Sequence, residues 1–128
     1  MKVLLDTNAL IWATDDGAEL STLARQCLSN PAAVKVVSVA AFWEMAIKVS
    51  LGKLSLGMPP NLLMETLVTK GEIELLGIMP EHLRCLLTLP HHHRDPFDWL
   101  MIAQALAEGW EVVSSDDQWD AYGVTRIW

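Results

Sequence analysis

Residues 3–8 of the chain are Val-Leu-Leu-Asp-Thr-Asn, and residues 112–117 are Val-Val-Ser-Ser-Asp-Asp. Each stretch is a short apolar run that ends near an acidic residue, Asp6 in the first and Asp116 in the second. Short apolar runs bounded by polar residues are typical of buried β-strands. Because open α/β sheets bind ligands just past the carboxyl ends of their strands, the two carboxylates indicate a metal site at such an edge.

Length and composition favour one domain in a reducing compartment. The chain has 128 residues, 52% of them apolar, which is enough to bury a core without disulfides or a structural metal, so we expect residues 1–128 to form a single domain. Cys27 and Cys85 form no Cys-x-x-Cys motif and show no zinc-finger spacing. Asp6 interrupts the apolar start, and no apolar run approaches the ~20 residues of a membrane helix. We therefore expect a soluble, cytoplasmic protein with no membrane contact.

The charge balance narrows the class of partner. Nine Lys and Arg against 16 Asp and Glu give a formal net charge of −7, which argues against a protein that reads DNA sequence through a basic face. A metal-dependent nuclease stays compatible with this charge, because each bound Mg²⁺ restores positive charge where a phosphate must approach.

Strand and helix patterns alternate along the whole chain. Asp95, Pro96 and Gly109 are typical of the N-cap, the first position and the end of a helix whose interior is apolar nearly all round. Such alternation implies crossover connections and a mostly parallel sheet, and therefore a three-layer α/β/α domain. We expect strands over residues 3–5, 34–39, 72–76, 110–114 and 124–128, and helices, caps included, over residues 8–14, 21–30, 40–51, 61–69, 81–87 and 95–109.

Four carboxylates stand out by their positions, and each also has a structural explanation. Asp6 could cap the short helix that follows it. Glu44 precedes Lys48 by four residues, the favourable order for a helical ion pair. Asp98 falls in the first turn of the long helix, where a carboxylate complements the helix dipole. Asp116 could belong to an ordinary turn.

Taken together, the four carboxylates indicate a function that none of them indicates alone. Mg²⁺ prefers oxygen ligands and takes a few carboxylates from separate elements. Strand ends and helix N-termini lie on the same edge of a parallel sheet, so Asp6, Asp98 and Asp116 are expected to share one face. Glu44 is expected to join them from the helix after the second strand, which predicts a magnesium site.

The order of these motifs carries a family resemblance that covers essentially the whole chain. It consists of Leu-Leu-Asp-Thr-Asn-Ala-Leu at residues 4–10, a helical Glu44, Asp-Pro-Phe-Asp-Trp-Leu-Met-Ile-Ala-Gln-Ala at 95–105, the acidic stretch at 112–117, and a terminal Tyr-Gly-Val and Ile-Trp. The sequence closely resembles the PIN domain. More narrowly, it is similar to the VapC-type ribonuclease toxins of bacterial toxin–antitoxin pairs.

The resemblance implies a five-stranded parallel sheet, Mg²⁺ or Mn²⁺ dependence and hydrolysis of RNA phosphodiesters. It also implies homodimers and inhibition by a small antitoxin that docks near the site. The family's acidic residues fall on Asp6, Glu44, Asp98 and Asp116, expected to hold one or two Mg²⁺ ions. Its polar helper falls on Asn8, expected to orient a ligand or the attacking water.

Two positions depart from the family pattern. Many relatives carry Arg directly after the second Asp of Asp-Pro-Phe-Asp, where this chain has Trp99. The family also often has Thr two positions before the last acid, where Ser114 keeps the hydroxyl.

Two other functions compete with the nuclease. Strands that end in Asp and Asp-Asp also occur in haloacid-dehalogenase-like phosphatases, but their opening motif needs a second Asp where this chain has Asn8. A non-catalytic, partner-binding module on the same fold is the other alternative, with a surface that includes Phe42, Trp43, Met58 and Leu62.

The run His91-His92-His93 also invites a metal assignment. Consecutive histidines cannot all face one ion in a regular element, so we interpret the run as a polar loop ahead of Asp95. Arg94 follows it and could contact phosphate, as could Lys48 and Lys53.

Overall fold

The computed structural model describes residues 1–15 and 17–128. Its five strands are all parallel and lie in the order β3-β2-β1-β4-β5. This confirms the expected α/β fold with a parallel sheet. The strands are β1 Lys2–Leu5, β2 Val34–Ser38, β3 Glu74–Leu76, β4 Glu111–Val113 and β5 Arg126–Ile127.

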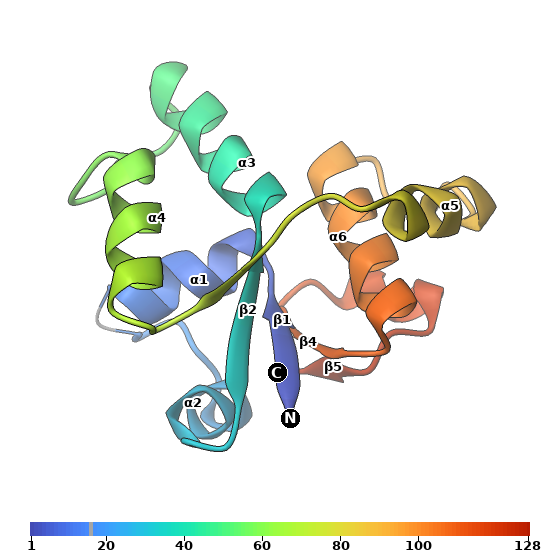
Figure 1. Cartoon of the computed structure of the whole chain (residues 1–128), viewed down its shortest axis with the longest axis horizontal. Coiled ribbons are helices and arrows are strands. Elements are labelled where there is room, and N and C mark those ends of the chain that lie inside the picture. The colour runs from blue at the N-terminus through green and yellow to red at the C-terminus, as the bar shows by residue number, and fades with distance from the viewer. Residues whose placement is uncertain (16) are drawn as a thin grey trace.

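Helices cover both faces of the sheet. Figure 1 shows α1 and α4 on one side of β1 and β2, and α5 and α6 on the other, which gives the expected three layers. The helices are α1 Thr7–Thr14, α2 Thr22–Ser29, α3 Val39–Ser50, α4 Pro60–Thr69, α5 Pro80–Thr88, α6 Pro96–Glu108 and the short 3₁₀ helix η1 Asp117–Tyr122.

The central strand β1 is apolar on both faces because both faces are covered. Val3, Leu4 and Leu5 are at most 1% exposed, and Val112 and Val113 of β4 are fully buried. Continuous apolar runs of this kind are characteristic of parallel strands between two helical layers. Pairing places Leu5 of β1 next to Val113 of β4, so the two strands end together and the residues after them emerge at one edge.

The long helix α6 begins and ends where the sequence predicts. The Asp95 side chain accepts hydrogen bonds from the backbone N–H groups of Phe97 and Asp98, and Pro96 occupies the first position. Gly109 ends the helix with a left-handed φ of 73°, a conformation that costs glycine little. These caps fix Asp98 in the first turn, at the amino end of the helix.

The differences from the predicted elements are small. Val39 begins α3 instead of ending a strand, because the Ser38 side chain caps that helix. The third strand begins at Glu74, two residues later than predicted, since the backbone N–H groups of Glu72 and Ile73 donate to the end of α4. The sequence did not reveal η1 after Asp116. The sequence of residues 15–17, Asp-Asp-Gly, predicts a turn after α1, and residue 16 lies outside the described residues.

No helix in the described part of the chain combines the length and the apolar character that a bilayer crossing requires.

Truncating the core of β1 should destabilise the fold strongly. Leu4 is fully buried in the central strand, so Leu4→Ala is expected to lower the free energy of unfolding by about 2–5 kcal/mol. Leu87→Ala is the matched control, because Leu87 is 84% exposed and its change should stay within about 0.5 kcal/mol. Urea denaturation measures both, and equal losses in the two variants would contradict this account of the core.

Candidate metal centre

Three of the predicted acidic residues lie at the carboxyl edge of the sheet because of the elements that carry them. Asp6 comes directly after β1, Asp116 comes shortly after β4, and Asp98 lies in the first turn of α6. In Figure 1, β1 and β2 run upward and α6 runs down from the same end, and β4 pairs in parallel with β1, so all three residues belong to the carboxyl edge of the sheet. Glu44 lies in α3, which continues directly from β2 at that edge.

Hydrogen bonds fix both oxygens of Asp6. One oxygen accepts from the backbone N–H of Ala9 at 2.7 Å, so Asp6 does cap α1, and the other accepts from the Ser114 hydroxyl at 2.6 Å. The same hydroxyl accepts from the backbone N–H of Asp116 at 3.1 Å. Ser114 therefore connects the acids that follow β1 and β4. Ser114 and Asp6 are 108 positions apart in the chain, so no local sequence pattern indicates this contact.

Glu44 is buried, although a helical ion pair with Lys48 would suggest a surface residue. The ion pair is present, but only 4% of the Glu44 side chain is exposed against 43% of the Lys48 side chain. The other Glu44 oxygen accepts from the Thr7 hydroxyl at 2.6 Å. Thr7 follows Asp6 directly, so α1 orients Glu44 as well, a role that sequence reasoning missed.

A histidine joins the remaining two acids. The Nε2 atom of His93 lies 2.7 Å from an oxygen of Asp116 and 3.2 Å from an oxygen of Asp98. Residues 91–95 form a loop, as interpreted, yet the His93 side chain is only 9% exposed and faces the acids instead of solvent. His91 and His92 are exposed, with their rings against Trp99 and Tyr122. No sequence pattern distinguishes His93, which points inward, from the two exposed histidines before it.

The ligand atoms form two overlapping groups. Oxygens of Glu44, Asp95 and Asp98 lie within 4.8 Å of one another, and so do atoms of His93, Asp98 and Asp116. Asp98 is common to both groups, whereas Asp6 belongs to neither. Asp95 was predicted only as a helix cap, and its carboxylate is a further oxygen beside the site.

Burial and mutual repulsion raise the pKa values of two of the acids. Burial is the main cause that raises the Asp98 pKa to about 7, and the charges of Asp95, Asp6 and Glu44 add to it. Burial likewise raises the Asp6 pKa to about 6, against the opposing effect of its hydrogen bonds from Ser114 and Ala9. The charges of Asp116 and Glu44 raise it further. Both carboxyls are therefore costly to ionise without a nearby cation.

The donor set fits a hard divalent cation. Carboxylate oxygens from separate elements converge on Asp98, and Mg²⁺ or Mn²⁺ favours such oxygens over sulfur or several imidazoles. A cation among these groups would also offset the repulsion that raises their pKa values.

Within the described residues, the side chains at positions 8 and 99 make no hydrogen bond with the four carboxylates. Asn8 lies in the first turn of α1 with an exposed side chain, and no hydrogen bond to the four acids is present for it within the described residues. Trp99 is partly buried, and its indole N–H is without a partner among the described residues. The Trp99 ring packs against His91 and contributes no charge.

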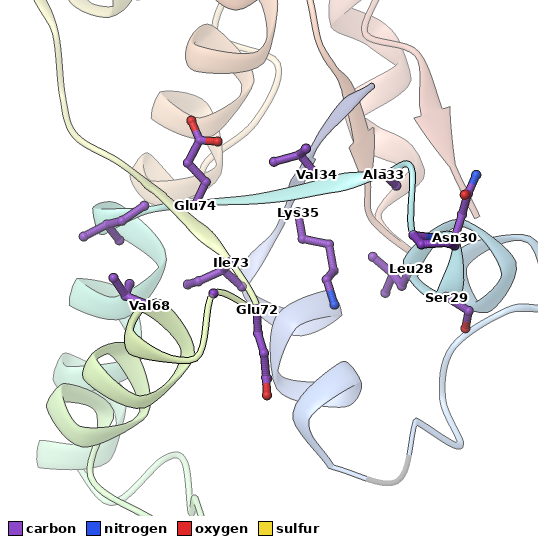
Figure 2. Close-up of a pocket in the computed structure, with 13 residues that line it drawn as sticks. Leu28, Ser29, Asn30, Ala33, Val34, Lys35, Val68, Glu72, Ile73 and Glu74 are labelled. Carbon is purple, nitrogen blue, oxygen red and sulfur yellow. The ribbon is translucent and has the colours of Figure 1, made fainter.

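A separate hollow of about 840 Å³ lies at the other end of β2 (Figure 2). Figure 2 shows Leu28 in the last turn of α2, Asn30 just after it, Lys35 on β2, and Ile73 with Glu74 at the start of β3 around it. The predicted site residues do not line it. It faces the amino ends of the strands, away from the edge where parallel sheets bind their ligands.

The Asp98 pKa predicts how stability depends on pH in metal-free protein. Because the folded state binds this proton more tightly than the unfolded chain, the free energy of unfolding should fall as the pH rises from about 4 to about 7. Asp98→Asn abolishes that ionisation, so its stability relative to the wild type should increase by about 2–3 kcal/mol from pH 5 to pH 8.

Urea denaturation in EDTA at the two pH values measures the difference in the free energy of unfolding between Asp98→Asn and the wild type. Asp117→Asn is the matched control, since Asp117 is an exposed neighbour of Asp116 and its own difference from the wild type should stay constant. If the difference between Asp98→Asn and the wild type is the same at both pH values, burial and repulsion do not raise the Asp98 pKa.

Solved structures share this fold over nearly their whole length. One is described as VapBC2 from Rickettsia felis bound to a DNA fragment from their promoter, with a TM-score of 0.72 at 14% identity over 98% of this chain and 97% of that one. Another is a toxin–antitoxin complex from Klebsiella pneumoniae, with a TM-score of 0.56 at 16% identity over 89% and 86% of the two chains.

Sequence comparisons give the family. A curated relative, Ribonuclease VapC22 of Mycobacterium tuberculosis (strain ATCC 25618 / H37Rv), is 27% identical over 115 residues, which cover 89% of this chain and 86% of the relative. The family model described as PIN domain matches residues 3–124, a stretch that contains all four acids and confirms the resemblance. The chain belongs to the PIN domain family.

Proposed function

We propose that this protein is a divalent-metal-dependent endoribonuclease that acts as the toxin of a toxin–antitoxin pair. The observation that carries the proposal is the convergence of Asp6, Glu44, Asp98 and Asp116 at one edge of the sheet, with two of these carboxyls costly to ionise. The curated relative is named a ribonuclease, which supports RNA as the substrate.

The four acids are the proposed ligands of Mg²⁺, for which Mn²⁺ could substitute. When bound, Mg²⁺ supplies the positive charge that polarises a phosphodiester and makes water acidic enough to act as nucleophile near neutral pH. The fit rests on oxygen ligands from separate elements. It also explains how a chain with a net charge of −7 could accept a polyanion, since the cation reverses the charge locally.

The surrounding residues fix the geometry of the acids. Ser114 and the N–H of Ala9 hold the Asp6 carboxylate, and Thr7 holds Glu44. Donors that orient ligating carboxylates keep their free lone pairs directed at one point, which is the usual role of groups behind a metal site. Asn8 is exposed beside Asp6, where it could orient the attacking water, and the exposed Arg94 could contact a phosphate.

The phosphatase alternative loses its support. The chain belongs to the PIN family, and Asn8 occupies the position where that reaction needs a second Asp. The non-catalytic module keeps one favourable observation, because Trp43, Met58 and Leu62 are 37–58% exposed, whereas Phe42 is buried. The exposed side chains serve a partner equally well on an active enzyme, so they do not favour an inactive one.

An antitoxin is the proposed inhibitory partner, and a second copy of the chain is the proposed dimer partner. The similarity to a toxin–antitoxin complex supports the first. A groove of about 340 Å³ supplies apolar surface for a partner, with a lining that includes Phe42, Trp43, Pro60 and Met64. The Trp43 ring packs edge-on against Phe97 in the first turn of α6, so a partner in this groove would reach the start of the helix that carries Asp98.

Cleavage of single-stranded RNA tests the activity. With Mg²⁺ present we expect cleavage by the wild type, loss of cleavage in EDTA, and a drop of about 100-fold or more in Asp98→Asn and Asp6→Asn, because each removes a carboxylate from the proposed cation site. Asp117→Asn should cleave like the wild type. Undiminished cleavage by Asp98→Asn or in EDTA would contradict the metal mechanism, and a wild type that neither binds metal nor cleaves RNA would favour the non-catalytic module.

Expression in a bacterial host tests the toxin role. Induction of the wild-type chain should arrest growth and reduce cellular RNA, whereas Asp6→Ala should allow growth because it removes a proposed ligand. Asp117→Asn, expressed to the same level, should arrest growth as the wild type does. Arrest by Asp6→Ala at the wild-type level would show that the toxicity does not depend on the acid site.

A further inference from the structure

We propose that His93 is a positioning residue, whose Nε2–H donates to Asp116 and lies against Asp98 and so holds the two carboxylates together, and that it is not itself a metal ligand. This inference rests on the proposed metal site. Neither the sequence patterns nor the comparisons assign a role to this histidine.

The hydrogen bonds of the ring determine which nitrogen carries the proton. Nδ1 lies 3.1 Å from the backbone nitrogen of Asp95, which donates its hydrogen, so Nδ1 is an acceptor. The proton of the neutral ring is therefore on Nε2. That atom is hydrogen-bonded to Asp116 at 2.7 Å, and its positively polarised N–H lies 3.2 Å from an oxygen of Asp98, close enough to attract this second carboxylate electrostatically.

The same hydrogen bonds argue against coordination of a metal by Nε2. A ligating Nε2 needs a free lone pair, which places the ring proton on Nδ1, directly against the N–H of Asp95. The Asp95 backbone cannot easily turn away, because its own side chain caps α6. Coordination would thus set two donors against each other, whereas donation satisfies both nitrogens.

The loop that carries His93 is held independently. The backbone N–H groups of His92 and His93 both donate to the Tyr122 hydroxyl, at 2.9 and 2.8 Å. Tyr122 is 9% exposed and ends η1, the 3₁₀ helix that begins directly after Asp116. The loop before α6 and the segment after β4 are therefore connected twice, through the tyrosine and through the imidazole.

The connection matters because Asp98 and Asp116 come from different elements and carry like charges. Without a donor between them, these carboxylates would move apart in solvent and would have to be brought together again on binding of a cation. A fixed donor behind ligating carboxylates typically contributes 10–100-fold to metal affinity.

Binding of Mn²⁺ to the whole protein tests the inference apart from catalysis. We expect His93→Ala to weaken Mn²⁺ binding by about 10-fold or more, as measured by electron paramagnetic resonance of the free ion. His93→Gln should regain most of this affinity, because its amide places an N–H donor as many bonds from Cβ as Nε2. Tyr122→Phe should fall between the wild type and His93→Ala, and His91→Ala, at an exposed position, should match the wild type.

Pulsed resonance on the Mn²⁺-loaded wild type separates donor from ligand. We expect no ¹⁴N coupling typical of a coordinated imidazole, and a coupling that disappears in His93→Gln would overturn the inference. Unchanged affinity in His93→Ala, or a loss that His93→Gln does not restore, would also overturn it. A wild type without Mn²⁺ binding would instead contradict the proposed function on which the inference depends. Should His93→Ala fail to fold, as judged by circular dichroism, the pulsed resonance spectrum of the wild type and the Mn²⁺ affinity of His93→Gln still distinguish a donor from a metal ligand.

Discussion

Repulsion between carboxylates is the constraint around which this edge of the protein is arranged. A parallel sheet whose strands β1 and β4 end together brings Asp6 and Asp116 to one edge, and α6 adds Asp98 to it. Burial raises the cost of ionisation at that edge, as the pKa values of about 6 and about 7 for Asp6 and Asp98 express. The fold tolerates such a cluster only where other groups compensate for it.

The compensation comes from a set of donors, each specific to one or two acids. Hydroxyls of Ser114 and Thr7 donate to Asp6 and Glu44, and Lys48 pairs with Glu44. These donors reduce the repulsion without removing it, which leaves a site that gains stability when a cation arrives. A stable core with a repulsive edge is a common arrangement for functional sites, where local stability is lower than elsewhere.

The sequence predicted what depends on short-range patterns and left out what depends on long-range contacts. Asp95 and Gly109 marked the ends of α6 because capping is local, and the apolar run before Asp6 marked β1 because both sheet faces are covered. The inward direction of His93 follows from Tyr122, almost thirty positions later in the chain, and no periodicity carries that information. The convergence of the four acids became predictable only once a parallel sheet was assumed.

If the carboxyls of raised pKa are the ligands of a divalent cation, as we propose, binding of the metal must displace their protons. Near pH 6.5 Asp98 should be mostly protonated and Asp6 partly so, so binding of Mg²⁺ or Mn²⁺ should release about one proton per site. Calorimetry in buffers of different ionisation enthalpy measures this number, which should fall towards zero at pH 9. Metal binding without proton release at pH 6.5, or release that persists unchanged in Asp98→Asn, would show that these carboxyls are not the ligands.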